Sequence, residues 1–151
     1  MLLPLTEDLI ATWAADPDCA RLADRHYSRG RRGHPQFAPS GRKLVLRDTA
    51  GLVVFVWLFP EATYRRDGQV GYNNTLFRNE SSRLSSAIIL EAERYAVAKW
   101  GPNRGYTYID ARKVASPNPG YCFKCAGWVH VGYSKDQHLH LLEKWLVAEG
   151  R

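Results

Sequence analysis

The sequence has few cysteines, no long hydrophobic run and no basic segment at its start. Three cysteines in 151 residues are too few, and odd in number, for a secreted disulfide framework, so the count favours a reducing compartment. The longest apolar run, residues 52–60, is too short to cross a bilayer. The apolar start MLLPLTEDLI is followed at once by acids and is not preceded by the basic region of a signal peptide. These absences predict a cytoplasmic protein with no membrane partner.

The remaining composition is that of one globular domain. Hydrophobic residues make up 45% of the chain and charged residues 24%, which is enough apolar surface for one core of this length. No internal repeat and no linker interrupts the pattern. The sequence therefore predicts a single mixed α/β domain over residues 1–151.

Positive charge is concentrated near the start of the chain. Seven basic residues and one acid, Asp24, lie between Arg21 and Lys43, whereas acids and bases balance elsewhere. The densest part, SRGRRGHPQFAPSGRK (28–43), is rich in Gly, Pro and Ser and is typical of a basic loop. Such loops bind phosphate backbones through charge, so double-stranded DNA is the expected partner. The candidate DNA-binding residues are Arg29, Arg31, Arg32, Arg42 and Lys43. A merely solvated loop is the alternative.

Hydrophobic periodicity predicts alternating helices and strands. Two N-terminal helices are expected, one capped by Thr6 and one beginning at Asp16-Pro17. Residues 43–59 follow the pattern of a strand hairpin that turns near 48–51, and its second arm is apolar enough for an interior strand covered on both faces. A shorter strand is expected near 72–77.

The second half of the chain predicts a long helix, a strand, a short helix and two strands. Ser81 and Ser82 offer caps for the long helix, which should end at Gly101-Pro102. A strand over 105–110 follows, then a short helix that starts after Asn118-Pro119. Two strands over 128–133 and 138–145 close the chain, and the last of them has some helical character.

Two cysteines in the short helix raise the question of a zinc site. Cys122 and Cys125 could bind zinc with a second pair drawn from three histidines, His130, His138 and His140. They are flanked by aromatics, however, and lack a Gly-rich knuckle. Both cysteines are therefore expected to pack on one helix face as small apolar residues.

The order of elements resembles the GNAT acyltransferase superfamily. In particular, the strand, Asn-initiated helix, Gly127-Trp128 and following strand resemble the C-terminal signature of that superfamily, and the junction at 77–84 lies where it binds acyl-CoA pyrophosphate. The resemblance implies a mixed sheet with a long central helix. Two departures stand out: RNESSRLSS (78–86) has no glycine where the superfamily has a Gly-rich loop, and Phe123 replaces the tyrosine that often protonates the departing thiolate.

Five segments more narrowly resemble the Mom family of phage DNA-modifying proteins. They are RHYSRG (25–30), LFR (76–78), the Ser-rich helix start, YID (108–110) and GYCFKCAGW (120–128). Members of that family are GNAT-like, lack the usual cofactor loop and transfer a carbamoylmethyl group to the adenine amino group in DNA. The resemblance implies catalytic roles for His26, Tyr27, Asp110 and Tyr121. It also implies cofactor contacts from Arg78, Ser82 and Ser85, and iron bound by His26, Asp110 and Tyr121, in the cytoplasm of the bacterial host.

Apart from the resemblance, Glu80 is a further candidate catalytic residue, since it would act as a general base if burial raised its pKa. Three functions remain open. The first is modification of a nucleobase in DNA, and the second is acyl-CoA-dependent acetylation of a small molecule or protein. The third is DNA binding by a GNAT-like domain without chemistry.

Overall fold

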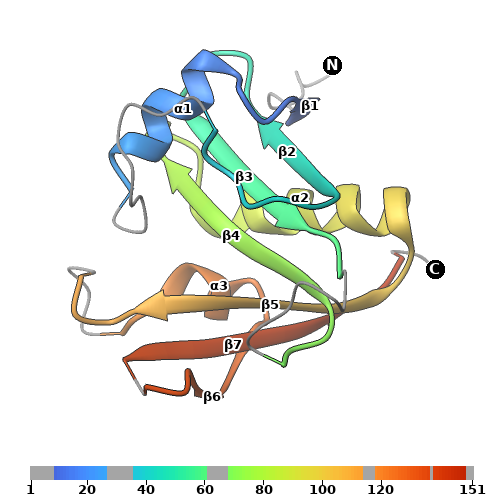
Figure 1. The fold of residues 1–151 in the computed structure, drawn as a ribbon, viewed down its shortest axis with the longest axis vertical. Coiled ribbons are helices and arrows are strands. Elements are labelled where there is room, and N and C mark those ends of the chain that lie inside the picture. Colours follow the sequence, from blue (N-terminus) through green and yellow to red (C-terminus); the bar gives the residue numbers. More distant parts are fainter. Residues whose placement is uncertain (1–8, 27–35, 61–67, 114–117, 137, 149–151) are drawn as a thin grey trace, which may run out of the picture.

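The protein is a seven-stranded mixed sheet with helices on both faces (Figure 1). The computed structural model describes residues 9–26, 36–60, 68–113, 118–136 and 138–148. The elements in chain order are β1 (Ile10–Thr12), α1 (Pro17–Asp24), β2 (Lys43–Arg47), β3 (Val53–Leu58), β4 (Tyr72–Asn79), α2 (Ser85–Trp100), β5 (Asn103–Asp110), α3 (Tyr121–Cys125), β6 (Val129–Tyr133) and β7 (Leu139–Leu146).

The strand order is β1-β2-β3-β4-β5-β7-β6. Neighbouring strands are antiparallel except β4 and β5, which are parallel. These two strands pair only from Tyr72 to Asn74 on β4 and from Gly105 to Thr107 on β5. Beyond those three pairs the strands part, so the sheet divides at its middle.

The two faces of β3 face two separate apolar clusters. Phe55 and Trp57 pack with Ile88 and Ala92 of α2, and the indole of Trp57 donates to the carbonyl of Ala92 at 2.9 Å. On the opposite face, Val54 and Val56 pack with residues of α1. The prediction of an interior strand over 52–59, buried on both faces beneath the long helix, is confirmed.

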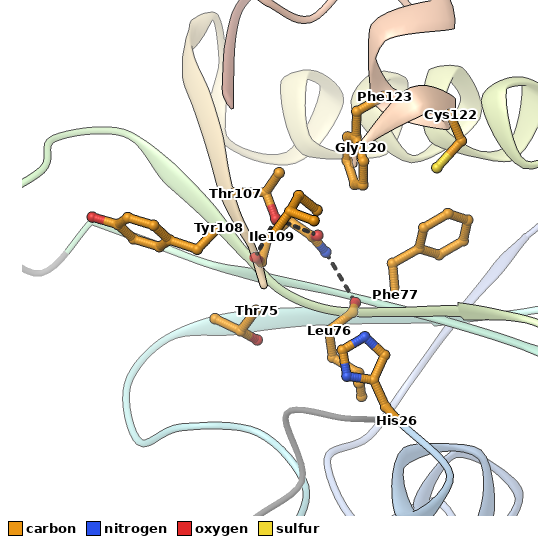
Figure 2. Close-up of a pocket in the computed structure, with 11 residues that line it drawn as sticks. His26, Thr75, Leu76, Phe77, Thr107, Tyr108, Ile109, Gly120, Cys122 and Phe123 are labelled. Carbon is orange, nitrogen blue, oxygen red and sulfur yellow. Dashed lines mark hydrogen bonds between the residues drawn. The ribbon is translucent and has the colours of Figure 1, made fainter. Parts of the chain in front are cut away.

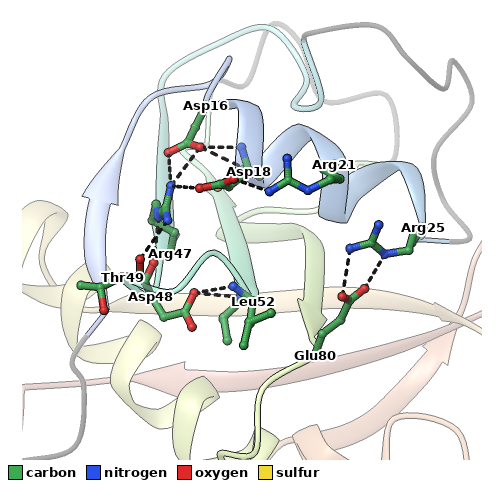
Figure 3. Close-up of polar contacts among 11 residues, drawn as sticks. Asp16, Asp18, Arg21, Arg25, Arg47, Asp48, Thr49, Leu52 and Glu80 are labelled. Carbon is green, nitrogen blue, oxygen red and sulfur yellow. Dashed lines mark hydrogen bonds and ion pairs between the residues drawn. The ribbon is translucent and has the colours of Figure 1, made fainter.

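α1 begins where the sequence predicted. The carboxylate of Asp16 accepts from the amides of Asp18 and Cys19, and Pro17 occupies the first turn, where its missing N–H costs nothing. The guanidinium of Arg47 on β2 lies 3.0 Å from the Asp16 carboxylate and ties the start of α1 to the sheet (Figure 3).

Three local predictions are wrong. The first N-terminal helix is absent from residues 10–12, which form edge strand β1 because they pair with residues 45–47 of β2. Thr6 lies outside the described residues. The long helix begins at Ser85, after Leu84, and not at the Ser81-Ser82 caps. β7 is extended throughout, because it pairs along its whole length with β5.

None of the described helices is both long and apolar enough to span a membrane.

Candidate functional site

The gap between β4 and β5 opens into a cavity of about 190 Å³, here called the splay cavity. Its lining comes from both faces of the sheet: His26 follows α1 on one face, and Phe123 of α3 lies on the other (Figure 2). The remaining lining residues are Asn74, Thr75, Leu76, Phe77, Thr107, Tyr108, Ile109, Gly120 and Cys122. A ligand in this cavity would therefore lie within the sheet and be reachable from either face.

A second cavity, the Asp110 cavity, adjoins the first. It has a volume of about 400 Å³ and includes Asp110 and Lys113. Asn74, Thr75 and Tyr108 line both cavities. These three residues form a shared wall, which suits a reaction between two molecules that enter from different sides.

His26 contributes a neutral imidazole to the splay cavity. Burial, together with the nearby Arg78 guanidinium, lowers its pKa to about 4. At neutral pH the ring is therefore uncharged and can accept a hydrogen bond or a proton. A base with so low a pKa is a weak one, so hydrogen bonding is the chemistry that this placement favours.

Asp110 ends β5, as the sequence predicted, and its carboxylate stays ionised. Its Oδ1 accepts from the backbone amide of Arg112 at 3.0 Å and from the Arg112 Nε at 3.2 Å. The Arg112 side chain is the main cause that lowers the pKa of this carboxyl. Because the Arg112 side chain is itself exposed, the carboxylate is held at the cavity by a partner that can move aside.

Glu80 does not have the raised pKa expected of a buried general base. Its carboxylate accepts hydrogen bonds from Arg25 at 2.7 and 2.9 Å (Figure 3). It also accepts one from Arg78 at 2.6 Å. The hydrogen bond from Arg25 and then that from Arg78 lower the pKa of Glu80 to about 2. The expectation from burial is wrong because two guanidinium groups outweigh desolvation, and Glu80 instead joins α1 to the end of β4.

Arg78, expected at a cofactor, is used in the same cluster. Its Nη1 donates to the carbonyl of Arg25 at 3.0 Å, and its Nε binds Glu80. The residue therefore lies at the end of β4, close to His26, as expected. Its described contacts are with the protein itself.

The β4–α2 loop, residues 80–84, closes on itself through Asn79. The amide of Glu80 donates to the carbonyl of Leu52, and that of Ser81 donates to Asn79 Oδ1 at 2.9 Å. The amide of Arg83 donates to Ser81 Oγ at 3.1 Å. Asn79 Nδ2 in turn donates to the hydroxyl of Ser85, whereas Ser82 is exposed. The backbone amides of Glu80, Ser81 and Arg83 therefore already have partners and are not available to a cofactor phosphate.

Tyr121 and the cysteines do not lie as expected. Tyr121 begins α3 but its side chain is 60% exposed and lines neither cavity. Cys125 is also exposed, so it does not pack the helix onto the sheet. Phe123 and Ala126 provide that packing, with Cys122 against their cluster, because Tyr121 and Cys125 fall on the outer side of this five-residue helix.

The proposed iron ligands are not brought together. His26 lines the splay cavity, Asp110 lines the adjoining one, and Tyr121 lies outside both. Within the described ranges, no group of three or more His, Cys, Asp and Glu side chains could hold a metal ion. The donor set therefore does not fit an iron bound by all three residues.

Residues 28–35 of the predicted DNA-binding loop, which include Arg29, Arg31 and Arg32, lie outside the described residues, and so does Tyr27. Of the other two candidates, Lys43 begins β2 and Arg42 packs over the ring of Phe59, its Cζ 3.9 Å from the centroid. Arg42 therefore contributes its charge from a position fixed against the sheet.

Sequence reasoning missed Asn74, Thr75, Thr107 and Tyr108. A signal was present: an Asn-Asn pair inside a strand is unfavourable unless its side chains replace backbone hydrogen bonds. Side chains replace backbone hydrogen bonds where a strand is irregular. The Asn73-Asn74 pair therefore marks the position at which the regular pairing of β4 with β3 is interrupted.

Comparison with solved structures identifies the architecture. The matches include an acyl-CoA N-acyltransferase from Pseudomonas aeruginosa, with a TM-score of 0.55 and 13% identity over 92% of this chain and 99% of that one. A mutant of spermidine N-acetyltransferase SpeG from Vibrio cholerae has a TM-score of 0.59 and 9% identity over 91% and 92%. The chain has the GNAT fold.

A third match agrees. It is described as histone acetyltransferase HPA2 and related acetyltransferase, from Corynebacterium glutamicum, and has a TM-score of 0.54 with 16% identity over 97% of this chain and 99% of that one. At these identities the likeness establishes the fold alone. No protein-family model and no curated protein sequence matches the chain.

Proposed function

We propose that this protein is a GNAT-type transferase that moves a small acyl-type group onto an amine. The observation that carries the proposal is the cavity between the parted strands β4 and β5, which is lined from both faces of the sheet and adjoins a second cavity with an ionised carboxylate. Two reactants could enter from different sides and meet at the wall that the cavities share.

The reaction would form a bond from the amine nitrogen to the transferred carbon and break the bond from that carbon to the donor's leaving group. The amine loses a proton and the leaving group gains one. Asp110 is the residue placed to attract and hold a cationic amine; because the pKa of this carboxyl is lowered, the proton that the amine loses passes to water. His26 is placed to orient the transferred group by a hydrogen bond.

Acyl-CoA is the donor class that the fold favours, since matched structures are described as an acyl-CoA N-acyltransferase and a spermidine N-acetyltransferase. The β4–α2 loop argues for a donor held in another way. Its amides at Glu80, Ser81 and Arg83 already have partners, and Arg83 pairs with Glu91 at 2.8 Å. A donor pyrophosphate would have to bind other amides, such as those of Ser85 and Ser86 at the start of α2.

A second candidate acceptor is the adenine amino group in DNA. Seven basic residues and one acid between Arg21 and Lys43 favour a polyanionic partner, and the five Mom-like segments include residues of both cavities and the β4–α2 loop. An enzyme acting on that group must extrude the base from the duplex, because stacking and pairing hide it.

One experiment separates the candidates. Plasmid DNA from cells expressing the chain is digested to nucleosides and weighed by mass spectrometry, while the purified chain is incubated with acetyl-CoA and polyamines. A new adenosine mass supports the DNA acceptor, and an acetylated polyamine supports the small-molecule acceptor. If neither appears and duplex DNA still binds, the chain is a binding protein and the transferase proposal is wrong.

The basic segment gives a separate prediction. Replacing Arg29, Arg31 and Arg32 with Ala should lower the slope of log affinity against log salt for duplex DNA by about three, since each lost phosphate contact removes about 0.9. Fluorescence anisotropy at several salt concentrations measures it. The control is the double variant Arg94→Ala, Lys99→Ala, which removes positive charge from α2 instead of from the basic segment. An unchanged slope in the triple variant would exclude this segment from DNA binding.

A further inference from the structure

β4 contains a one-residue bulge at Thr75. On the neighbouring strand β3, Val56 pairs with Leu76 and Trp57 pairs with Asn74, so Thr75 has no opposite residue. The bulge reverses which face each later side chain occupies. Tyr72 packs on the α2 face, yet Leu76, four residues on, packs on the α1 face, and Phe77 contacts the α2 face. Arg78 consequently reaches Arg25 and Glu80 on the α1 side.

A bulge of this kind leaves carbonyl groups without ladder partners. The side chain of Asn74 supplies them: its Nδ2 donates to the carbonyl of Val56 at 3.1 Å and to that of Leu76 at 2.9 Å. Asn74 is 5% exposed, so water does not compete for these bonds. One amide group thus closes the bulge on its own strand and ties it to β3.

Thr107 on β5 completes the arrangement. Its hydroxyl lies 3.0 Å from Asn74 Oδ1 and 3.1 Å from the Asn74 carbonyl, so it fixes the amide in the orientation that aims Nδ2 at the bulge. Asn74 and Thr107 are also the last paired residues of β4 and β5 before the strands part. The same pair therefore lies at the closed end of the splay cavity.

We propose that Asn74, oriented by Thr107, is a positioning residue for the reaction: it sets the point at which β4 and β5 part and holds the shared wall of the two cavities. Thr75 and Tyr108, the wall residues that follow this pair on each strand, take their places from it. The kinetic arm of the test rests on the proposed transfer; the structural arm does not.

The structural arm measures amide hydrogen exchange in Thr107→Val, which keeps the shape of the side chain and removes only its hydroxyl. We expect exchange at Leu76, Phe77, Tyr108 and Ile109 to rise about tenfold more than exchange in the middle of α2. Thr107→Ser retains the hydroxyl and should behave like the wild type. Asn74→Asp, which loses both donors, should show a larger change, and Thr107→Val decides the matter where Asn74→Asp does not fold.

Ile88→Val on α2 is the control, because it removes a buried methyl group from the core away from both cavities and should lower the melting temperature by roughly 2–4 °C. If Thr107→Val raised exchange near the cavities only in proportion to exchange in α2, as expected for Ile88→Val, the pair would be ordinary core structure and the proposal would be wrong.

The kinetic arm uses the transfer assay in which the wild-type chain is active. A positioning role predicts that kcat of Thr107→Val falls about tenfold or more while KM for the acceptor changes little, with recovery in Thr107→Ser. An equal fall in kcat in Thr107→Val and Ile88→Val would contradict the positioning role. If the wild type transfers nothing, the proposed function fails, and the exchange arm still decides the role of Asn74.

Discussion

The β4–α2 loop and the splay cavity both adjoin β4, but their polar groups are used differently. In the loop, Asn79 binds Ser81 and Ser85, and Glu80 is held by two guanidinium groups. In the cavity wall, the buried hydroxyl Oγ1 of Thr75 is without a hydrogen-bond partner in the part of the chain that the structure describes. Buried polar groups without partners are rare and concentrate at functional sites.

This difference indicates that the loop beyond β4 has a structural role, whereas the part of β4 at the cavity is available to a ligand. The loop stabilises itself and fastens α1 to the sheet through Arg25 and Glu80. The cavity wall carries a cost that a bound ligand would remove. Substitutions in the loop should therefore change stability more than transfer, and substitutions in the cavities should do the reverse.

The largest expected effect comes from comparing two carboxylates. Asp110→Asn should reduce transfer by about 100-fold or more, because it removes the only carboxylate that lines the described part of the Asp110 cavity. Its melting temperature should stay within a few degrees of the wild type, since an Asn side-chain oxygen can still accept from the Arg112 amide and the ion pair that is lost is with an exposed side chain. Steady-state kinetics with thermal melts measure both quantities.

Glu80→Gln is the matched control. It also neutralises a carboxylate at the end of a neighbouring strand, but it should change kcat by less than about threefold and lower the melting temperature by a few degrees. Comparable kinetic losses in the two variants would remove the distinction between loop and cavity.

Strands and helices were predicted well where packing follows local pattern. The hairpin of β2 and β3, the ends of α1 and α2 set by Pro17 and Gly101, and the short helix α3 all agree with the sequence. The failures occur where tertiary contacts outweigh that pattern. Residues 10–12 follow an apolar pattern compatible with a helix, yet they pair with β2.

Of the predicted site residues, the structure brings only some to the two cavities. His26 and Asp110 came from the resemblance to the Mom family, and the structure places each of them in a cavity. Glu80 was given the wrong pKa because its two arginine partners are 55 and 2 residues away, and the distant one cannot be seen in sequence. The bulge at Thr75 was missed because it depends on the register between β3 and β4.

The cavity residue His26 and the loop residue Glu80 should affect the free energy of unfolding in different pH ranges. His26 has a folded pKa of about 4 against 6.5 when unfolded, so its contribution is complete above pH 6.5 and is lost as pH falls towards 4. The loss at pH 4 should be about 2 kcal/mol, allowing for partial exposure of the ring. Urea unfolding of wild type and His26→Gln between pH 7 and 4 measures it.

Glu80 contributes at lower pH. Its folded pKa is about 2 against 4.5 unfolded, so its contribution is complete above pH 4.5 and is lost as pH falls towards 2. Glu80→Gln should therefore parallel the wild type from pH 7 to 5, whereas His26→Gln should flatten the curve there. A His26→Gln curve with the wild-type slope between pH 6.5 and 4 would show that the ring is not buried as described.

The smallest expected effect concerns the two threonines at the parting of the strands. Thr75→Val should raise the free energy of unfolding by about 1 kcal/mol, because it replaces a buried hydroxyl that has no partner with a methyl group of similar volume. Thr107→Val should lower it by about 1–2 kcal/mol, because the same replacement leaves Asn74 Oδ1 without its donor. Chemical denaturation of both variants measures the pair. A gain in stability at Thr75 accompanied by weaker transfer would identify a hydroxyl that is retained for its ligand at the expense of stability. A loss of stability at Thr75 would mean that the hydroxyl has a partner, such as a bound water, in the folded chain, and the contrast between the loop and the cavity would then no longer hold.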